Sequence, residues 1–157
     1  MTPRRLDPGV VQRKLTLMDE LLQDLDQFRA VDGATLRADR VTRHAVERVL
    51  TQLVQLAVDI NAHLVAGMGR PSPADYRGSF DSAIEAGVLP AELAARLRPS
   101  VGLRNLLIHE YAAIDLDLVA AACGRASTDY RDYVRTVARR PGPPPFCRSR
   151  RPLKTPV

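Results

Sequence analysis

Apolar residues recur at intervals of three and four along most of the chain, which is the spacing of helices that bury one face. Residues 10–29 carry the first such stripe, and a longer one covers residues 46–64. Ser72 and Pro73 then supply an N-cap and a proline suited to the first helical position, which predicts a third helix running to Gly87. No segment alternates with the period of a β-strand. The pattern therefore predicts an all-α fold.

Two more helices are predicted in the C-terminal half. Pro90 can open one of them, but Pro99 lies inside its stripe, has no N–H to donate and clashes with the preceding turn. We therefore expect a break or kink near Pro99, with residues 100–110 as a separately aimed helical piece. Asp115 is the expected cap of a last helix that runs to Val137. Together these elements predict an up-and-down bundle of four to five helices.

The end of the chain differs in composition from the rest. Its Pro-rich run cannot continue a helix and its Arg-rich remainder has little to bury, which predicts a helical domain over residues 1–139 and a disordered Pro/Arg-rich basic tail over residues 140–157. The whole chain has 23 Lys and Arg against 18 Asp and Glu, a net charge of +5. Residues 139–157 hold six of these cations and no acid. The helical body is thus near neutral, and the basic excess belongs to the tail.

Composition also narrows the class of protein. No run of about 18 apolar residues is present, and residues 1–7 lack the apolar core of a secretory signal, so we expect a cytoplasmic protein with no membrane span. Cys123 and Cys147 lie far apart and share no metal-ligand spacing with each other or with histidines. We expect two free thiols and no metal site.

One segment concentrates the reactive side chains. Residues 104–111 hold a guanidinium, an amide, an imidazole, a carboxylate and a phenol. At about 100° per residue, Asn105 and His109 share one side of a straight helix, while Arg104 lies about 140° from His109. One helix cannot aim Arg104 and His109 at the same atom. A fraying helix end near His109, or a second copy of the helix across a two-fold axis, would bring them together.

These groups suit the cleavage of an RNA phosphodiester. The 2′-OH loses a proton as it attacks, the 5′-oxygen gains one as it leaves, and negative charge builds up on the phosphate between these events. Histidine can carry out the proton transfers, and arginine can stabilise the charge. We expect His109 to act as general acid/base and Arg104 to bind the phosphate, with no metal or cofactor. A homodimer supplies a second His109 for the second proton transfer. Asn105 either caps the kinked helix or orients His109 from one turn away.

The order Arg104-Asn105-x3-His109-x-Tyr111 resembles the R-x4-6-H-x-Y signature of the HEPN ribonucleases. Residues 101–111 as a whole are similar to the corresponding stretch of the HepT/DUF86 toxins, and the resemblance extends over residues 10–138. Three other stretches sit where that family has similar segments: Asp59-Ile60-Asn61-Ala62-His63-Leu64, Asp75-Tyr76 followed by Phe80, and Gly87-Val88-Leu89-Pro90.

The resemblance implies a HEPN-type bundle and a toxin endoribonuclease of a HepT/MntA-type toxin–antitoxin system. It further implies a homodimer with a composite cleft and a small nucleotidyltransferase antitoxin of the MntA type. In that family the antitoxin adenylylates the tyrosine of the motif, which is Tyr111 here. An attached nucleotide would place anionic phosphate beside Arg104 and His109, where RNA should bind.

Two other hypotheses remain open from the sequence. The chain could be a non-catalytic HEPN-like helical dimer that serves a nucleotidyltransferase as adaptor or nucleotide-binding subunit, or a plain structural bundle. The presence of all three motif side chains favours the enzyme. Among the remaining polar residues, Asp59 and His63 are expected to pair along one helical face, and Tyr76 is expected to be a packing residue.

Overall fold

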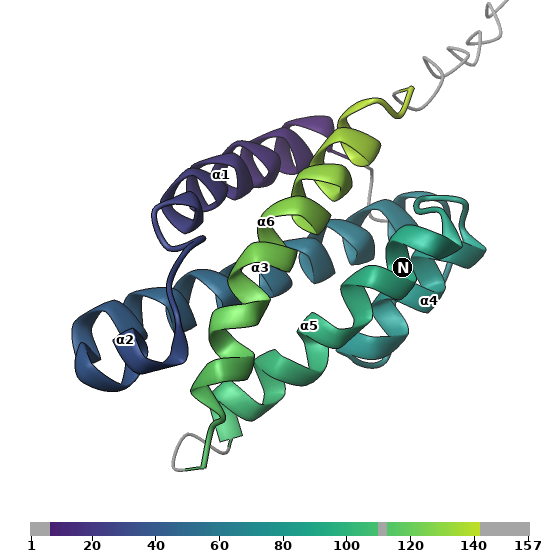
Figure 1. Cartoon of the computed structure of the whole chain (residues 1–157). Helices are drawn as coiled ribbons and strands as arrows, with labels where there is room; N and C mark the ends of the chain where they lie inside the picture. The colour runs from purple at the N-terminus through teal and green to yellow at the C-terminus, as the bar shows by residue number, and fades with distance from the viewer. Residues whose placement is uncertain (1–6, 110–112, 142–157) are drawn as a thin grey trace, which may run out of the picture.

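The computed structural model describes residues 7–109 and 113–141 (Figure 1). These two ranges contain helices and no strand, so the prediction of an all-α fold is confirmed. The helices, in chain order, are α1 (Pro8–Asp26), α2 (Gly33–Ala38), α3 (Arg40–Gly67), α4 (Tyr76–Glu85), α5 (Ala91–His109) and α6 (Leu116–Ala138).

Helix α3 is the centre of the bundle and contacts every other helix. In Figure 1, α1 and α6 lie side by side over α3, and α5 runs along the other side of α6. By length and composition α3 could also cross a membrane. However, its apolar stripe is the one that fills the core of this bundle, because residues from Val46 to Val65 on one face are buried. Packing against the other helices therefore accounts for the stripe.

The start of α4 is set by Asp75. The prediction that residues 72–73 begin this helix is wrong: the first helical residue is Tyr76, and the Asp75 side chain accepts a hydrogen bond from the Gly78 N–H at 2.6 Å. Aspartate and serine are about equally strong N-caps, so Ser72 and Asp75 could each have begun this helix. The structure uses Asp75. Tyr76 is thereby placed at the helix start, where its side chain contacts α5.

The short helix α2 raises the number of helices in the described ranges to six, one more than predicted. Asp32 caps it by accepting from the Thr35 N–H at 2.7 Å. Its first residue, Gly33, lies against the start of α6, where an added Cβ would come within 1.8 Å of an Asp117 carboxylate oxygen. Gly33 is therefore a point of close packing between α2 and α6.

Helix α5 continues through Pro99, so the predicted break is wrong, while the alternative, a kink, stays a prediction. A proline inside a helix costs about 3 kcal/mol. Leu97 and Val101 lie on either side of it and are both buried, and burying such side chains gains about 1.5–3 kcal/mol each. Ser100 adds a hydrogen bond to the Tyr130 hydroxyl at 2.6 Å. Packing on both sides of Pro99 thus offsets the lost backbone bond.

The helical body ends where α6 ends, near the predicted boundary. The Arg140 Nη1 atom donates to the Gly87 carbonyl at 2.5 Å, which attaches the residue after the helix to the loop before α5. Residue 140 therefore belongs to the folded body. The predicted disorder of the remaining tail falls on residues 142–157, which lie outside the described ranges.

Candidate functional site

The last two turns of α5 carry the predicted site residues and expose them. Every buried residue of this helix lies between Leu93 and Val101, and none lies from Gly102 onward. Asn105 and His109 are exposed, and Arg104 is half-buried. Tyr111, the fourth predicted site residue, lies outside the described ranges. The site is therefore a surface at one end of the bundle.

Arg104 is held by Tyr76 at the start of α4. The guanidinium carbon lies 4.1 Å from the centre of the Tyr76 ring, an attractive cation–π geometry. Its Nη2 atom donates to the Tyr76 hydroxyl at 3.1 Å, and its Nη1 atom donates to the Asn105 side-chain oxygen at 3.2 Å. Its Nε atom is buried and has no hydrogen-bond partner among the residues that the structure describes. The guanidinium is thus fixed from two sides.

Behind Tyr76 lies a chain of hydrogen bonds that reaches α3 and α1. The Tyr76 hydroxyl donates to the Gln55 side-chain oxygen, and Gln55 Nε2 donates to one Asp59 carboxylate oxygen at 2.9 Å. The other Asp59 oxygen accepts from Lys14 Nζ at 3.0 Å. Tyr76 therefore does more than pack, and sequence reasoning missed both this contact and Gln55. The one available signal was that Asp75-Tyr76 belongs to the resemblance.

The predicted pair of Asp59 and His63 does not form. Both Asp59 oxygens are engaged by Lys14 and Gln55. The His63 Nε2 atom instead accepts a hydrogen bond from the Asp7 backbone N–H at 3.0 Å. His63 thus holds the start of α1 in place, and Asp59 serves the network behind Arg104.

Asn105 contacts Arg104, because its side-chain oxygen accepts the hydrogen bond from Nη1. Its expected role, as a cap of the helix or in orienting His109, stays a prediction. The helix is intact from Arg104 to His109, its last residue. Within one chain these two side chains therefore remain on faces about 140° apart.

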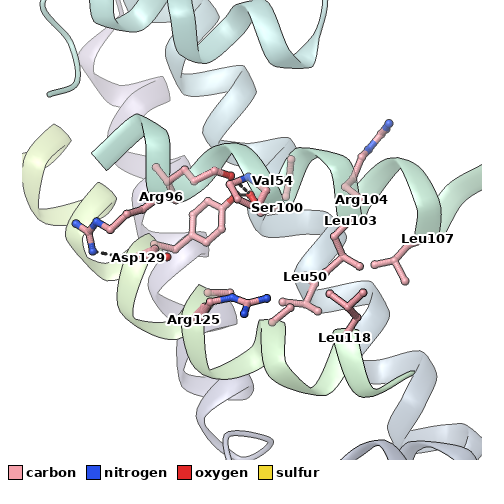
Figure 2. Close-up of a pocket in the computed structure, with 15 residues that line it drawn as sticks. Leu50, Val54, Arg96, Ser100, Leu103, Arg104, Leu107, Leu118, Arg125 and Asp129 are labelled. Carbon is pink, nitrogen blue, oxygen red and sulfur yellow. Dashed lines mark hydrogen bonds and ion pairs between the residues drawn. The ribbon is translucent and has the colours of Figure 1, made fainter. Parts of the chain in front are cut away.

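An apolar surface lies next to the charged one. A pocket of about 410 Å³ between α3, α5 and α6 is lined at one end by leucines. Figure 2 shows Leu103, Leu107 and Leu118 pointing into this pocket, while Arg104 points away from it. A second groove of about 360 Å³ adds Leu106 on the same side of α5. The end of α5 thus presents a charged face and an apolar face.

The thiol and metal chemistry of the described ranges is limited. Cys123 is a free, buried cysteine, and burial raises the pKa of its thiol to about 11. A thiol in that state is a poor nucleophile and metal ligand. No group of three or more His, Cys, Asp or Glu side chains able to hold a metal ion is found within residues 7–109 and 113–141. Cys147 lies outside these ranges.

The helical bundle with Arg104 and His109 at an exposed helix end has the HEPN-type fold. A solved structure of the tri-AMPylated Shewanella oneidensis HEPN toxin in complex with MNT antitoxin matches it with a TM-score of 0.75 and 20% identity, covering 84% of this chain and 98% of that one. A toxin–antitoxin crystal structure with AMP-PNP gives the same TM-score over 83% of this chain.

Sequence comparison identifies the family. The family model for HepT-like ribonucleases matches residues 18–137. The "tRNA nuclease HepT" of Aphanizomenon flos-aquae is 33% identical over 84% of this chain and 90% of its own length. The "mRNA nuclease HepT" of Shewanella oneidensis is 21% identical over 82% of this chain and 96% of its own length. The chain belongs to the HepT-like ribonuclease family.

Proposed function

We propose that this chain is the toxin endoribonuclease of a two-component toxin–antitoxin system and cleaves RNA without a metal ion. Arg104 binds the scissile phosphate, and His109 acts as general acid/base. The observation that carries the proposal is the fixed guanidinium of Arg104 on the same exposed helix end as His109. Membership of a ribonuclease family and relatives named as tRNA and mRNA nucleases support RNA as the substrate.

The donors of Arg104 suit this role. A guanidinium has five N–H groups and no acceptor. One N–H of Nη1 and one of Nη2 are used inside the protein, and the Nε edge is buried. Among the described residues each terminal nitrogen keeps a second N–H without a partner, and these two can bind the phosphate oxygens. Charge-assisted bonds of this kind strengthen as negative charge develops in the transition state.

We further infer that the active form is a homodimer whose cleft combines motif residues of both copies. Leu106 and Leu118 are 43% and 51% exposed and line the same groove beside the end of α5. Large apolar side chains clustered at a surface gain free energy when a partner covers them. In the proposed dimer the second copy supplies another His109, because the intact helix of one chain keeps Arg104 and His109 on different faces.

The inhibitor that fits this site is a nucleotidyltransferase antitoxin of the MntA type that adenylylates Tyr111. The support comes from the sequence position, two residues after His109, and from the structurally similar HEPN toxin, which is tri-AMPylated and bound to MNT antitoxin. Co-expression with such an antitoxin should add the mass of AMP to the peptide that contains Tyr111. An unmodified peptide from cells in which toxicity is nevertheless neutralised would contradict this route.

The catalytic assignment is tested with Arg104→Ala and His109→Ala, assayed on labelled total cellular RNA. Loss of charge stabilisation or of proton transfer should lower the cleavage rate by at least about 100-fold. The melting temperature should stay near that of the parent chain because neither side chain fills the core. Arg98→Ala is the matched control, since Arg98 lies on α5 and pairs with Asp81 instead.

Several outcomes would contradict this function. Retained cleavage by both variants would exclude Arg104 and His109 as the catalytic pair, whereas a parent chain that does not cleave RNA would favour the non-catalytic adaptor. Cleavage that EDTA abolishes would exclude a metal-independent mechanism. A third experiment tests the dimer by mixing equal amounts of parent and His109→Ala chains and letting them exchange subunits. If each cleft needs His109 from both copies, the mixture should retain about a quarter of the parent activity. If the two sites are independent, it should retain about half.

A further inference from the structure

Two contacts of different kinds join Arg104 to one residue on another helix. The face of the Tyr76 ring lies under the guanidinium at 4.1 Å and limits its tilt. The hydroxyl of the same residue accepts from Nη2 at 3.1 Å and limits rotation within the guanidinium plane. Asn105 adds a third restraint on Nη1. An arginine near a solvent-exposed helix end thus has one preset orientation.

The hydrogen bonds behind Tyr76 allow only one arrangement of protons. Asp59 accepts from Lys14 and can only accept, so the Gln55 amide must turn its NH₂ group toward Asp59 and its oxygen toward Tyr76. The Tyr76 hydroxyl therefore gives its proton to Gln55 and keeps a lone pair for Arg104. The network makes Tyr76 an acceptor toward Arg104, as a guanidinium requires.

We propose that Tyr76 is a positioning residue of the HepT-like site, which holds Arg104 so that its two free terminal N–H groups face the scissile phosphate. This inference rests on the proposed function of Arg104. Without Tyr76, the arginine side chain would have to give up its rotamer freedom each time RNA binds, which lowers kcat/KM by on the order of tenfold. Gln55 and Asp59 act through Tyr76, by way of the hydrogen bonds that fix its hydroxyl.

The test compares two substitutions of Tyr76 in the full-length chain on labelled total cellular RNA. Tyr76→Phe keeps the ring and loses the hydroxyl, so kcat/KM should fall about three- to tenfold. Tyr76→Leu loses both contacts and should lower kcat/KM by more than tenfold. Tyr130→Phe is the matched control: it also removes a hydroxyl that contacts α5, through Ser100, and should change cleavage by less than about twofold.

A second measurement separates positioning from folding. In an Arg104→Lys background, which retains a cation but no planar fork, Tyr76→Phe should cause little further loss, because the contact it removes is already absent. A structural defect would instead lower the activity of both backgrounds by the same factor. Melting temperatures of all variants provide the fold control.

The results that overturn each proposal are different. If the parent chain does not cleave RNA, the proposed function fails. If the parent chain cleaves RNA and both Tyr76 variants cleave equally well, Tyr76 does not position Arg104. The inference also fails if Tyr76→Phe has the same fractional effect in the parent and Arg104→Lys backgrounds.

Discussion

The two halves of α5 have the same secondary structure and opposite uses. The first half buries Leu93, Ala94, Leu97 and Val101 among the other helices, whereas no residue of the second half is fully buried. The second half instead carries Arg104 and His109. Residues that build the fold and residues proposed to perform the chemistry are thus separated along one helix. Substitutions in the two halves should therefore have different consequences.

The largest expected difference is in stability. Leu97 is 1% exposed, and Leu97→Ala should lower the free energy of unfolding by about 2–5 kcal/mol. Leu106 is 43% exposed, and Leu106→Ala should cost less than about 1 kcal/mol because it leaves no cavity in the monomer. Urea denaturation at low protein concentration measures both. Equal losses would show that the second half of α5 also supports the fold of the monomer.

The next prediction concerns assembly and uses a charge in place of the apolar side chain. Leu106→Asp should weaken the dimer, because the new carboxylate loses water when the interface closes. RNA cleavage should fall together with the dimer fraction measured by sedimentation, while the melting temperature of the monomer changes little. Leu17→Asp on α1 is the matched control, since Leu17 is 41% exposed and lies outside α5. Unchanged dimerisation of Leu106→Asp would place the interface elsewhere.

The helices that the apolar pattern predicted well are those whose stripes face the core. The predicted stripe of α1 includes Leu15, Met18, Leu22 and Leu25, and all four are buried. Burial depends on which face of a helix is apolar, and the spacing along the chain contains that information. Two predictions failed because opposing local effects had to be weighed. Asp75, and not residues 72–73, sets the start of α4, and packing around Pro99 outweighs the one backbone hydrogen bond that the proline removes.

The site residues also divide into those that the spacing along the chain could identify and those that it could not. Arg104 and His109 could be proposed from their spacing because both lie on one helix. Tyr76 could not be linked to Arg104 in that way, since the two residues are 28 positions apart and meet only because α4 packs across α5. Spacing along the helix suggested that Asn105 caps the helix or orients His109, and it gave no indication of the hydrogen bond between Asn105 and its neighbour Arg104.

The smallest expected effect is that of the basic tail, which carries positive charge as the end of α5 does but has no role assigned in the site. Removal of residues 142–157 leaves the Arg140 contact with Gly87 in place and deletes four cations. At physiological salt, charges more than about 8 Å from RNA phosphates are largely screened, so cleavage should change little. At low salt, RNA affinity should fall modestly, with a shallower dependence on salt concentration. Replacing the four cations by serine in the full-length chain controls for chain length. Loss of cleavage at physiological salt would show that the tail, and not only the fixed Arg104, supplies the charge that holds the substrate.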